Sequence, residues 1–190
     1  MTTDEKFLLY EKLLREWNER MNLVAPSTLC DIRNRHINDS LQLVEHLSCD
    51  VKIFDLGSGA GFPAVVLAVL GLDVTAIESI SKKCAFLNEL KSQLDLPNFK
   101  VINERIENIF TRKMENKKRI AITARAFAAL SKILDMTYFI NAEYVLLKGE
   151  SAPKEIAIAK ENYNFDYKLI PSNTGPGYIL IINNVKRRKK

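Results

Sequence analysis

Long hydrophobic runs are absent from this 190-residue sequence. No apolar stretch approaches the roughly 18 residues that a membrane-spanning helix needs. The N-terminal stretch, MTTDEKFLLYEKLLREW, places acidic residues before its first apolar cluster and carries charges throughout, which is unlike a secretory signal. The sequence therefore predicts a cytoplasmic protein that binds no membrane.

Cysteine and histidine are also scarce. The three cysteines, Cys30, Cys49 and Cys84, lie far apart and form no CxxC pair, and the two histidines, His36 and His46, are well separated. Disulfide frameworks and zinc sites need such residues in closely spaced sets. We therefore expect neither disulfides nor a bound metal.

Apart from its last five residues, the chain carries no net charge. The sequence has 28 Lys and Arg against 23 Asp and Glu, and five of the basic residues form its end, KRRKK (Lys186–Lys190). Without them the two signs balance at 23 each. Such a segment attracts polyanions, with an affinity that depends on salt. It is either an RNA-binding element or a solvated, frayed terminus.

The length and the hydrophobic fraction of 47% suit one globular domain with a real core. No internal repeat or linker divides the chain, and nothing indicates an obligate dimer, so we expect a monomer with a single domain over residues 1–190. Its parts are a helical extension (1–48), a Rossmann-like α/β core (51–184) and the basic tail (185–190).

The hydrophobic pattern changes near Val51. Before it, apolar residues at helical spacing predict one helix around Tyr10 to Met21 and another from about Leu29 to Leu47. After it, β-rich runs alternate with helical stretches, which predicts βαβ units and a parallel sheet with helices on both faces. The last two runs have no helix between them, so they should form a closing antiparallel hairpin. The runs are VKIFDL, DVTAIE, FKVIN, RIAITA, AEYVLLKG, FDYKLI and GYILII, and the later helices are 63–70, 82–94, 106–110, 129–140 and 153–161.

A glycine-rich turn, GSGAG, follows the first run. Gly57, Gly59 and Gly61 allow a tight turn and a close approach of the backbone to a ligand. Glu78 ends the next strand, 21 residues after Gly57, where an acid accepts hydrogen bonds from the ribose hydroxyls of a bound nucleoside. The turn and Glu78 together predict a nucleoside-containing ligand; glycines that only shape a sharp turn are the alternative.

The identity of that ligand follows from what the turn lacks. No Gly-Lys-Ser/Thr follows it, which excludes a phosphate-binding P-loop, and the spacing GxGxG differs from the GxGxxG of dinucleotide folds. Asp55 precedes the turn where a pyrophosphate would arrive. An acid there repels phosphate and suits a ligand with an amino group and a sulfonium, which favours S-adenosylmethionine over NAD.

A second signal, ARAFAAL, follows the fourth strand and places Arg125 at the carboxyl edge of the sheet. The chain has no Asp/Asn-Pro-Pro-aromatic motif to orient an exocyclic amine and no placed cysteine to attack a pyrimidine. The predicted acceptor is therefore nucleophilic as it stands, as guanine N7 is. Arg125 and Phe127 are candidates to stack on an unpaired base.

Several motifs together resemble one family. WNERMNLV, RHINDSL, DLGSGAGFP, ESISKKCAFL, ARAFAAL and LLKG occur in the order seen in the RsmG, or GidB, family. These bacterial methyltransferases modify guanine N7 in small-subunit (16S) ribosomal RNA. The resemblance implies a class I S-adenosylmethionine-dependent fold, with a seven-stranded, mostly parallel sheet, a closing antiparallel strand and an N-terminal helical extension.

The resemblance also implies a set of site residues. Arg125 would orient the reactants without acid–base chemistry, since N7 loses no proton. The cofactor contacts implied by the resemblance are Gly57, Phe62, Ile106, Glu107 and Arg125, and the glycine turn and its flanking acids add Asp55, Gly59, Gly61 and Glu78. The expected RNA-side residues are Arg35, His36, Asp39, Phe127 and Lys148.

Two other functions remain open. A methyltransferase of this fold could act on a small molecule or a protein, and a related module could bind RNA or NAD without catalysis. The expected partner is small-subunit ribosomal RNA, either free, in the 30S subunit or in an assembly intermediate.

Overall fold

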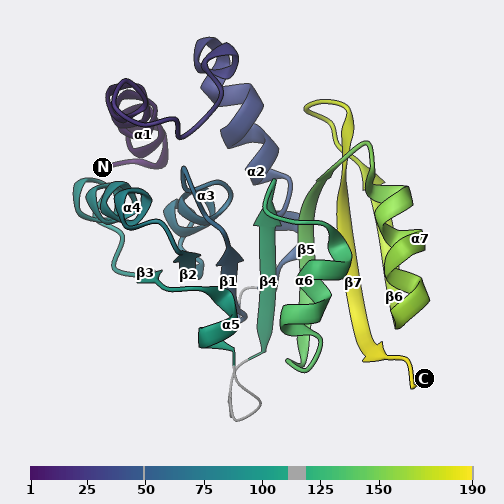
Figure 1. The fold of residues 1–190 in the computed structure, drawn as a ribbon. Helices are drawn as coiled ribbons and strands as arrows, with labels where there is room; N and C mark the ends of the chain where they lie inside the picture. The colour runs from purple at the N-terminus through teal and green to yellow at the C-terminus, as the bar shows by residue number, and fades with distance from the viewer. Residues whose placement is uncertain (49, 111–118, 190) are drawn as a thin grey trace.

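One sheet organises the protein, which a computed structural model describes over residues 1–48, 50–110 and 119–189. Its strands are β1 (Lys52–Leu56), β2 (Asp73–Glu78), β3 (Phe99–Asn103), β4 (Ile120–Arg125), β5 (Ala142–Gly149), β6 (Tyr163–Pro171) and β7 (Gly177–Arg187). Their order is β3-β2-β1-β4-β5-β7-β6 (Figure 1). Strands β1 to β5 pair in parallel, and β7 runs antiparallel to both β5 and β6. The predicted sheet with its closing antiparallel strand is confirmed.

The chain order reverses between β1 and β4. From β1 the chain winds outward through β2 to β3, returns to pair β4 with β1, and continues to β5. Ligands of open α/β sheets bind at such a switch point, beyond the carboxyl ends of the strands. The glycine turn after β1 and Arg125 at the end of β4 both lie at this edge.

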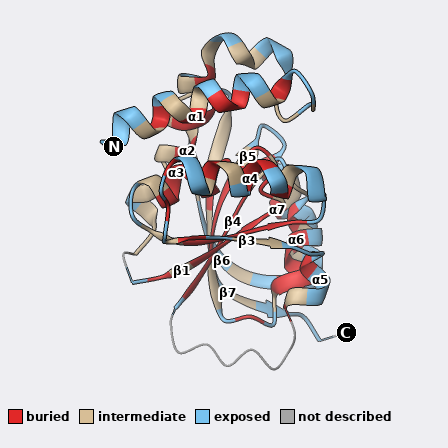
Figure 2. Ribbon diagram, turned by 90° about the vertical axis from the view of Figure 1, so that its left-hand side faces the viewer, coloured by how far each residue is buried: buried red, intermediate tan, exposed pale blue. Residues whose placement is uncertain are grey.

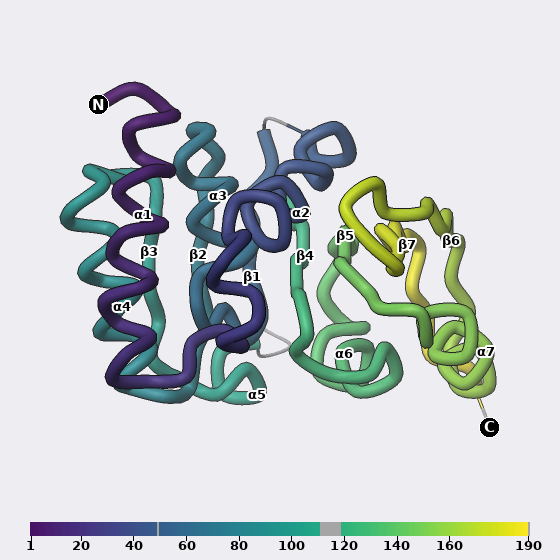
Figure 3. The backbone as a smooth tube through the Cα atoms, turned by 90° about the horizontal axis from the view of Figure 1, so that it is seen from above, coloured from purple at the N-terminus to yellow at the C-terminus, as the bar shows by residue number. Residues whose placement is uncertain are grey.

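Helices cover both faces of the sheet, as the view from above shows (Figure 3). Residues alternate between faces along a strand, so Ile53 belongs to one buried cluster and Phe54 to the other. The burial colouring shows the strands as the buried layer between the helices (Figure 2). One face carries α1 (Thr3–Asn18), α3 (Ala64–Val69) and α4 (Ser81–Gln93), and the other α5 (Ile106–Ile109), α6 (Leu130–Thr137) and α7 (Ala152–Asn162).

The predicted helix from about Leu29 to Leu47 is helical without a gap as far as Leu41, but it is not a regular α-helix. The segment is divided into a 3-10 helix, Pro26–Asp31, a π-helix, η2 (Arg33–Asn38), a short α2 (Asp39–Leu41) and a 3-10 turn, Val44–His46. The Ser40 hydroxyl donates to the His36 carbonyl at 2.7 Å, and such side-chain bonds distort helices. The distortion shapes the part of the extension that faces the sheet edge, and π segments often occur at functional sites.

The last strand is longer than its sequence pattern indicated. We predicted an apolar run ending at Ile182, and β7 continues to Arg187, so the start of the basic segment is part of the sheet. Cys30 and Cys84 are free thiols, while Cys49 and Lys190 lie outside the described residues. None of the helices in the described ranges has the length and apolar character needed to cross a membrane.

Candidate active site

The glycine turn depends on its missing side chains. Gly57, Gly59 and Gly61 all have positive φ, at 66°, 53° and 93°. A Cβ on Gly57 would lie 2.2 Å from the Phe127 ring, and one on Gly61 would lie 2.8 Å from the Tyr10 hydroxyl. That hydroxyl donates to the Ala60 carbonyl at 2.6 Å. The extension and the ARAF loop therefore both pack directly on the turn.

Glu78 is fixed beside this turn at the end of β2. Its side chain is 5% exposed, and its two carboxylate oxygens accept hydrogen bonds from the Gly59 and Ile80 amides, both at 2.9 Å. An ionised carboxylate offers about four acceptor positions. The two backbone hydrogen bonds leave about two acceptor positions free for hydroxyl groups of a ligand.

A cavity of about 460 Å³ opens next to Glu78. We call it the Glu78 cavity. Its size lies within the usual range for small-molecule sites. Apolar side chains of Ile106, Phe127 and Met136 line it together with Gly57, Glu78 and Glu107. The structure thus brings together four residues expected to contact the cofactor. It also places Phe127, expected on the RNA side, at this cavity.

Other residues of the cofactor set lie elsewhere. Phe62 is 4% exposed, and its ring stacks between the rings of Tyr10 and His36, each with a centroid separation of 4.9 Å. Arg125 also covers this ring, at 4.9 Å. The side chain of Phe62 therefore ties the turn to the extension. Gly59 and Gly61 shape the backbone of the turn and do not line the Glu78 cavity.

Asp55 is buried beneath the turn, at 1% exposure. One carboxylate oxygen accepts a hydrogen bond from the Thr123 hydroxyl at 2.8 Å, and the other has no partner in the described part of the chain. Burial disfavours the charged form and raises the pKa of Asp55 to about 7. The side chain is thus an unsatisfied acceptor that a nearby positive charge would stabilise.

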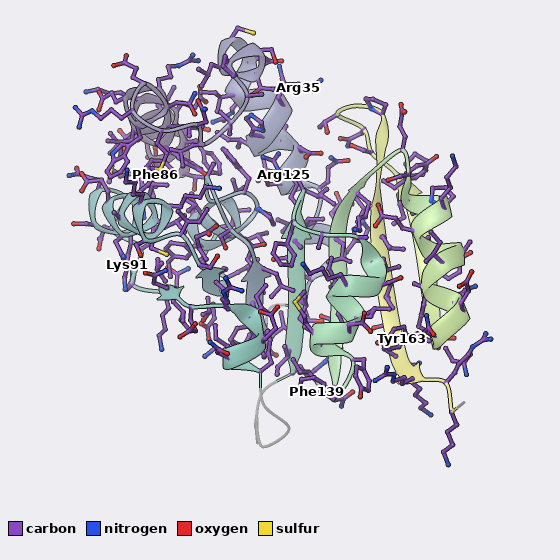
Figure 4. All side chains as sticks on the ribbon, viewed as in Figure 1. Arg35, Phe86, Lys91, Arg125, Phe139 and Tyr163 are labelled. Carbon is purple, nitrogen blue, oxygen red and sulfur yellow. The ribbon has the colours of Figure 1, made fainter. Side chains whose placement is uncertain are left out.

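A second cavity, of about 440 Å³, lies on the other side of the ARAF loop. We call it the Arg125 cavity. It collects four expected RNA-side residues and Arg125, although they come from opposite parts of the chain, and Figure 4 shows Arg35 and Arg125 on the facing elements. Its lining includes Arg35, His36, Asp39, Arg125 and Lys148, and residues 172 and 174–178 between and within the last two strands.

Arg125 is held by the extension from several sides. One guanidinium nitrogen donates to Asp39 and to the Arg35 carbonyl, both at 3.3 Å, and the other lies 2.9 Å from Nδ1 of His36. The Arg125 side chain is 18% exposed and that of Asp39 is 20% exposed. The sheet edge and the extension therefore form one polar assembly, and Arg125 is oriented before any ligand arrives.

His36 is kept neutral by these contacts. A guanidinium can only donate, so Nδ1 of His36 accepts, and its Nε2 carries the hydrogen that bonds to the Thr28 hydroxyl at 2.8 Å. Burial and the charges of Arg125 and Arg35 lower the pKa of His36 to about 4. Both ring nitrogens are occupied, so His36 positions Arg125 and is unsuited to act as a base.

Lys148 lines the Arg125 cavity but is already paired. Its ammonium donates to Glu155 at 2.6 Å and to the Ala128 carbonyl at 2.8 Å, and its side chain is 8% exposed. Glu155 also accepts from the Leu130 amide at 2.8 Å. The pair holds the loop between β4 and α6 in place. Glu155 was missed in the sequence because nothing in the sequence of α7 links it to this loop.

Gln42 was missed for the same reason. Its amide nitrogen donates to Asp39 at 3.2 Å and to Ser172 and Thr174 at 3.1 Å, and its oxygen accepts from the Asn173 amide at 2.8 Å. Thr174 also donates to Asp39 at 2.8 Å. These bonds fasten the β6–β7 loop (residues 172–176) to the extension. No local signal predicts contacts between residues about 130 positions apart.

Ala126 lines both cavities. It is a non-glycine residue with φ of 50°, a conformation that costs roughly 1–2 kcal/mol. The left-handed turn directs the chain from the Arg125 cavity to Phe127 at the Glu78 cavity. The two cavities therefore meet at one residue, as a site for transfer between a cofactor and an acceptor requires.

Comparisons with known proteins identify the family. A family model described as GidB, rRNA small subunit methyltransferase G, matches residues 3–174. The chain belongs to this family. It is 39% identical to the ribosomal RNA small subunit methyltransferase G of Rickettsia prowazekii, over 96% of this chain and 95% of that one. It is 41% identical to the protein of the same name from Orientia tsutsugamushi, over 90% and 85%.

Solved structures support the fold at lower identity. MtNAS in complex with S-adenosylmethionine superposes with a TM-score of 0.62 at 12% identity, over 95% of this chain and 75% of that one. The fibrillarin/Nop5p complex gives 0.56 at 16% identity, over 82% of each chain. Within the described residues, no three His, Cys, Asp or Glu side chains gather as a metal site would need.

Proposed function

We propose that this protein transfers a methyl group from S-adenosylmethionine to N7 of a guanine in small-subunit (16S) ribosomal RNA, in the cytoplasm. The observation that carries the proposal is the pair of cavities that meet at Ala126. One has the features of a nucleoside site, and the other is rich in basic side chains. Membership of the methyltransferase G family supports the same assignment.

The residues of the Glu78 cavity fit the cofactor. The free acceptor positions of Glu78 suit two ribose hydroxyls, and Ile106, Phe127 and Met136 offer apolar contact to an adenine. The carboxyl group of Asp55, with one oxygen unpaired, lies buried under the turn, and a cationic methionine part bound nearby would favour its ionised form. Bound S-adenosylmethionine supplies an electrophilic methyl group for direct displacement by a nucleophile.

The Arg125 cavity fits a guanine that needs no deprotonation. Its histidine is neutral and has both nitrogens occupied, so it offers no free base. N7 carries a lone pair in the ring plane and attacks as it stands. The chain then contributes alignment, because Arg125 is fixed by three groups of the extension. Alignment of the two reactants can lower the activation free energy by roughly 7–11 kcal/mol.

The test of the function is to map N7-methylguanine in ribosomal RNA of a strain that lacks the gene. We expect one modified guanine of the small-subunit RNA to lose its methyl group, and the restored gene to return it. The purified protein should transfer label from methyl-labelled S-adenosylmethionine to small-subunit RNA or subunits from that strain. An unchanged modification pattern would refute the proposal.

The cofactor assignment is tested at Glu78. Glu78→Gln keeps the shape of the side chain and removes its charge, and hydrogen bonds to charged groups are worth about 1.5–3 kcal/mol. We expect the Kd for S-adenosylmethionine to rise about 10- to 100-fold by calorimetry, with RNA affinity kept. Glu104→Gln, at an exposed acid of the same cavity, is the control and should change little. Unchanged cofactor affinity in Glu78→Gln would remove Glu78 from the ribose site.

A further inference from the structure

The excess positive charge of the chain gathers at the far end of β7. Lys186 pairs in register with Asn164 of β6, and Arg187 pairs with Tyr163. Beyond the strand, Arg188 donates from its backbone to the Asn162 carbonyl at 2.9 Å and from its side chain to Asn164 at 2.8 Å. The basic segment is therefore anchored to the sheet as far as Arg188.

A lysine and two aromatic rings join this segment. The ammonium of Lys160, on α7, lies 4.3 Å from the centroid of the Tyr167 ring and 5.9 Å from that of Phe165. The two rings are 6.1 Å apart, and Tyr167 is 45% exposed. An exposed tyrosine on an edge strand, next to a lysine, leaves a π-face within reach of another ring.

A cavity of about 400 Å³ is lined by Phe165 and by basic residues of α7 and the C-terminal segment, and Tyr167 adjoins it through its contact with Lys160. Lys160, Lys186 and Arg188 line it, and the acid in its lining, Asp166, accepts a hydrogen bond from Asn184 at 2.7 Å. The charge of the lining is therefore positive. We call Lys160, Phe165, Tyr167, Lys186 and Arg188 the C-terminal patch.

We propose that the C-terminal patch is a second RNA-binding site, which holds a single-stranded segment of the substrate away from the methylated guanine. Basic side chains beside aromatic platforms are what proteins use for single-stranded nucleic acid, since the charges contact phosphates and the rings stack on bases. The inference rests on the proposed function, because it takes the partner to be the RNA substrate.

The patch and the Arg125 cavity lie at opposite ends of β7. Gly177 and Tyr178 at the start of the strand line the Arg125 cavity, and Lys186 near its end lines the patch. At about 3.3 Å per residue, the strand separates them by roughly 30 Å. Figure 1 shows the C-terminus at the end of the sheet opposite the tip of β4. One RNA must therefore span this distance to occupy both sites.

The experiment compares two triple variants of the full-length protein with the same net charge. The patch variant is Lys160→Gln/Lys186→Gln/Arg188→Gln. The control is Lys82→Gln/Lys91→Gln/Lys100→Gln, on α4 and β3 at the opposite side of the sheet; Figure 4 labels Lys91 and Tyr163 on these two sides. Methyl transfer is measured on small-subunit RNA and on a fragment around the target guanine that is too short to span the two sites.

With long RNA, we expect the patch variant to raise KM about tenfold and to leave kcat unchanged. Each lost phosphate contact lowers the slope of log affinity against log salt by about 0.7, so the slope should fall by about 2. The control variant should shift KM less than twofold. With the short fragment as substrate, the patch variant and the wild-type protein should have the same KM.

A single substitution tests the stacking part. Tyr167→Ala should raise KM for long RNA about fivefold or more, whereas Tyr167→Phe, which keeps the ring, should match wild type. Equal losses in both triple variants, or an unchanged KM in the patch variant, would overturn the proposal. Failure of the proposed function looks different, since the wild-type protein would then methylate neither RNA.

Discussion

The two cavities that meet at Ala126 are built in different ways. The Glu78 cavity is made by the ends of neighbouring strands and the turns that follow them, so one edge of the parallel sheet supplies most of it. The Arg125 cavity is assembled from η2, the ends of β4 and β5, and the β6–β7 loop, which lie far apart in the sequence. The sheet therefore dictates the Glu78 cavity, our proposed cofactor side, while tertiary contacts with the extension create the Arg125 cavity, our proposed acceptor side.

The two cavities should respond separately to mutation, and Arg125→Ala gives the largest expected effect. It removes the group on which His36, Asp39 and the Arg35 carbonyl converge. Removal of one preorganised donor from an active site typically costs about 2.7–4 kcal/mol of transition-state stabilisation. We expect kcat/KM for RNA to fall about 100- to 1,000-fold, with the Kd for S-adenosylmethionine within a factor of three.

Arg125→Lys is the companion variant. It keeps the charge but cannot make the forked contacts, so it should recover little activity. A wild-type rate in Arg125→Ala would place this residue outside the reaction. A large loss of cofactor affinity would support the cofactor contact that the resemblance implies for Arg125 and would show that the two cavities do not act separately.

On the cofactor side, Gly57→Ala should be damaging and Gly59→Ala mild. Both residues have positive φ, but a Cβ on Gly57 meets the Phe127 ring at 2.2 Å, while one on Gly59 meets only a carbonyl oxygen at 3.7 Å. In Gly57→Ala the ring of Phe127 must move, and this changes the lining of the Glu78 cavity. We expect the Kd for S-adenosylmethionine to rise about 30-fold, and both proteins to lose about 1 kcal/mol of stability from backbone strain.

The double variant Gly57→Ala/Phe127→Ala separates the collision from the strain. Because Phe127 also lines the cavity, Phe127→Ala alone is the reference, and in its background Gly57→Ala should lower the cofactor affinity less than it does in wild type. Equal cofactor affinities in Gly57→Ala and Gly59→Ala, measured by calorimetry, would show that the contact with Phe127 is unimportant.

The sequence predicted the sheet-built side well for a physical reason. Strand and helix periodicities are local, and the carboxyl ends of parallel strands meet at one edge, so Gly57, Glu78 and Ile106 had to converge. The closing hairpin followed from the same pattern, whereas the order of the strands came only from the structure. The cavity then required only that these ends leave space between them.

The acceptor side could be predicted only in part. The motifs pointed to Arg35, His36 and Asp39, but not to the bonds that hold Arg125 against them. The contacts of Gln42 depend on segments distant in sequence, and the π-helix around His36 is not distinguished from an α-helix by the hydrophobic pattern. Phe62 illustrates the same limit, because its ring packs against the extension although it follows the glycine turn directly. Its role as a cofactor contact stays a prediction.

Opposite pH dependences should distinguish the two sides. Asp55, with a pKa raised to about 7, retains a proton that the unfolded chain has lost above about pH 4, so its contribution to stability falls with pH up to 7. His36, with a pKa lowered to about 4, lacks a proton that the unfolded chain holds below about pH 6.5, so its contribution rises with pH. Between about pH 4 and 6.5 the two slopes cancel.

Single substitutions should separate the two opposing pH dependences of the free energy of unfolding. In Asp55→Asn the free energy of unfolding should rise with pH relative to wild type, by up to about 1.4 kcal/mol per unit, and in His36→Gln it should fall by a similar amount. Urea unfolding at pH 4.5, 5.5 and 6.5 measures both, with those values chosen at roughly one-unit steps inside the window. Parallel curves for the three proteins would contradict the assigned protonation states.

The smallest effect is expected at Gln42, which does not line the Arg125 cavity but bonds to Asp39 and to the β6–β7 loop, both of which line it. Gln42→Ala removes its bonds to Ser172, Asn173 and Thr174, each worth about 1 kcal/mol or less. The loop should then line the cavity less firmly. We expect kcat/KM for RNA to fall about five- to tenfold, with the Kd for S-adenosylmethionine unchanged.

Asn98→Ala is the matched control for Gln42→Ala. The Asn98 amide also joins two segments, by donating to the Ala68 and Leu72 carbonyls at 2.8 and 2.6 Å, but it lies away from both cavities. It should lower the Tm by a similar amount and leave RNA methylation unchanged. If the two variants lose activity in proportion to stability, Gln42 has only a structural role. If Gln42→Ala alone weakens RNA methylation, the acceptor side depends on a contact that the sheet does not provide.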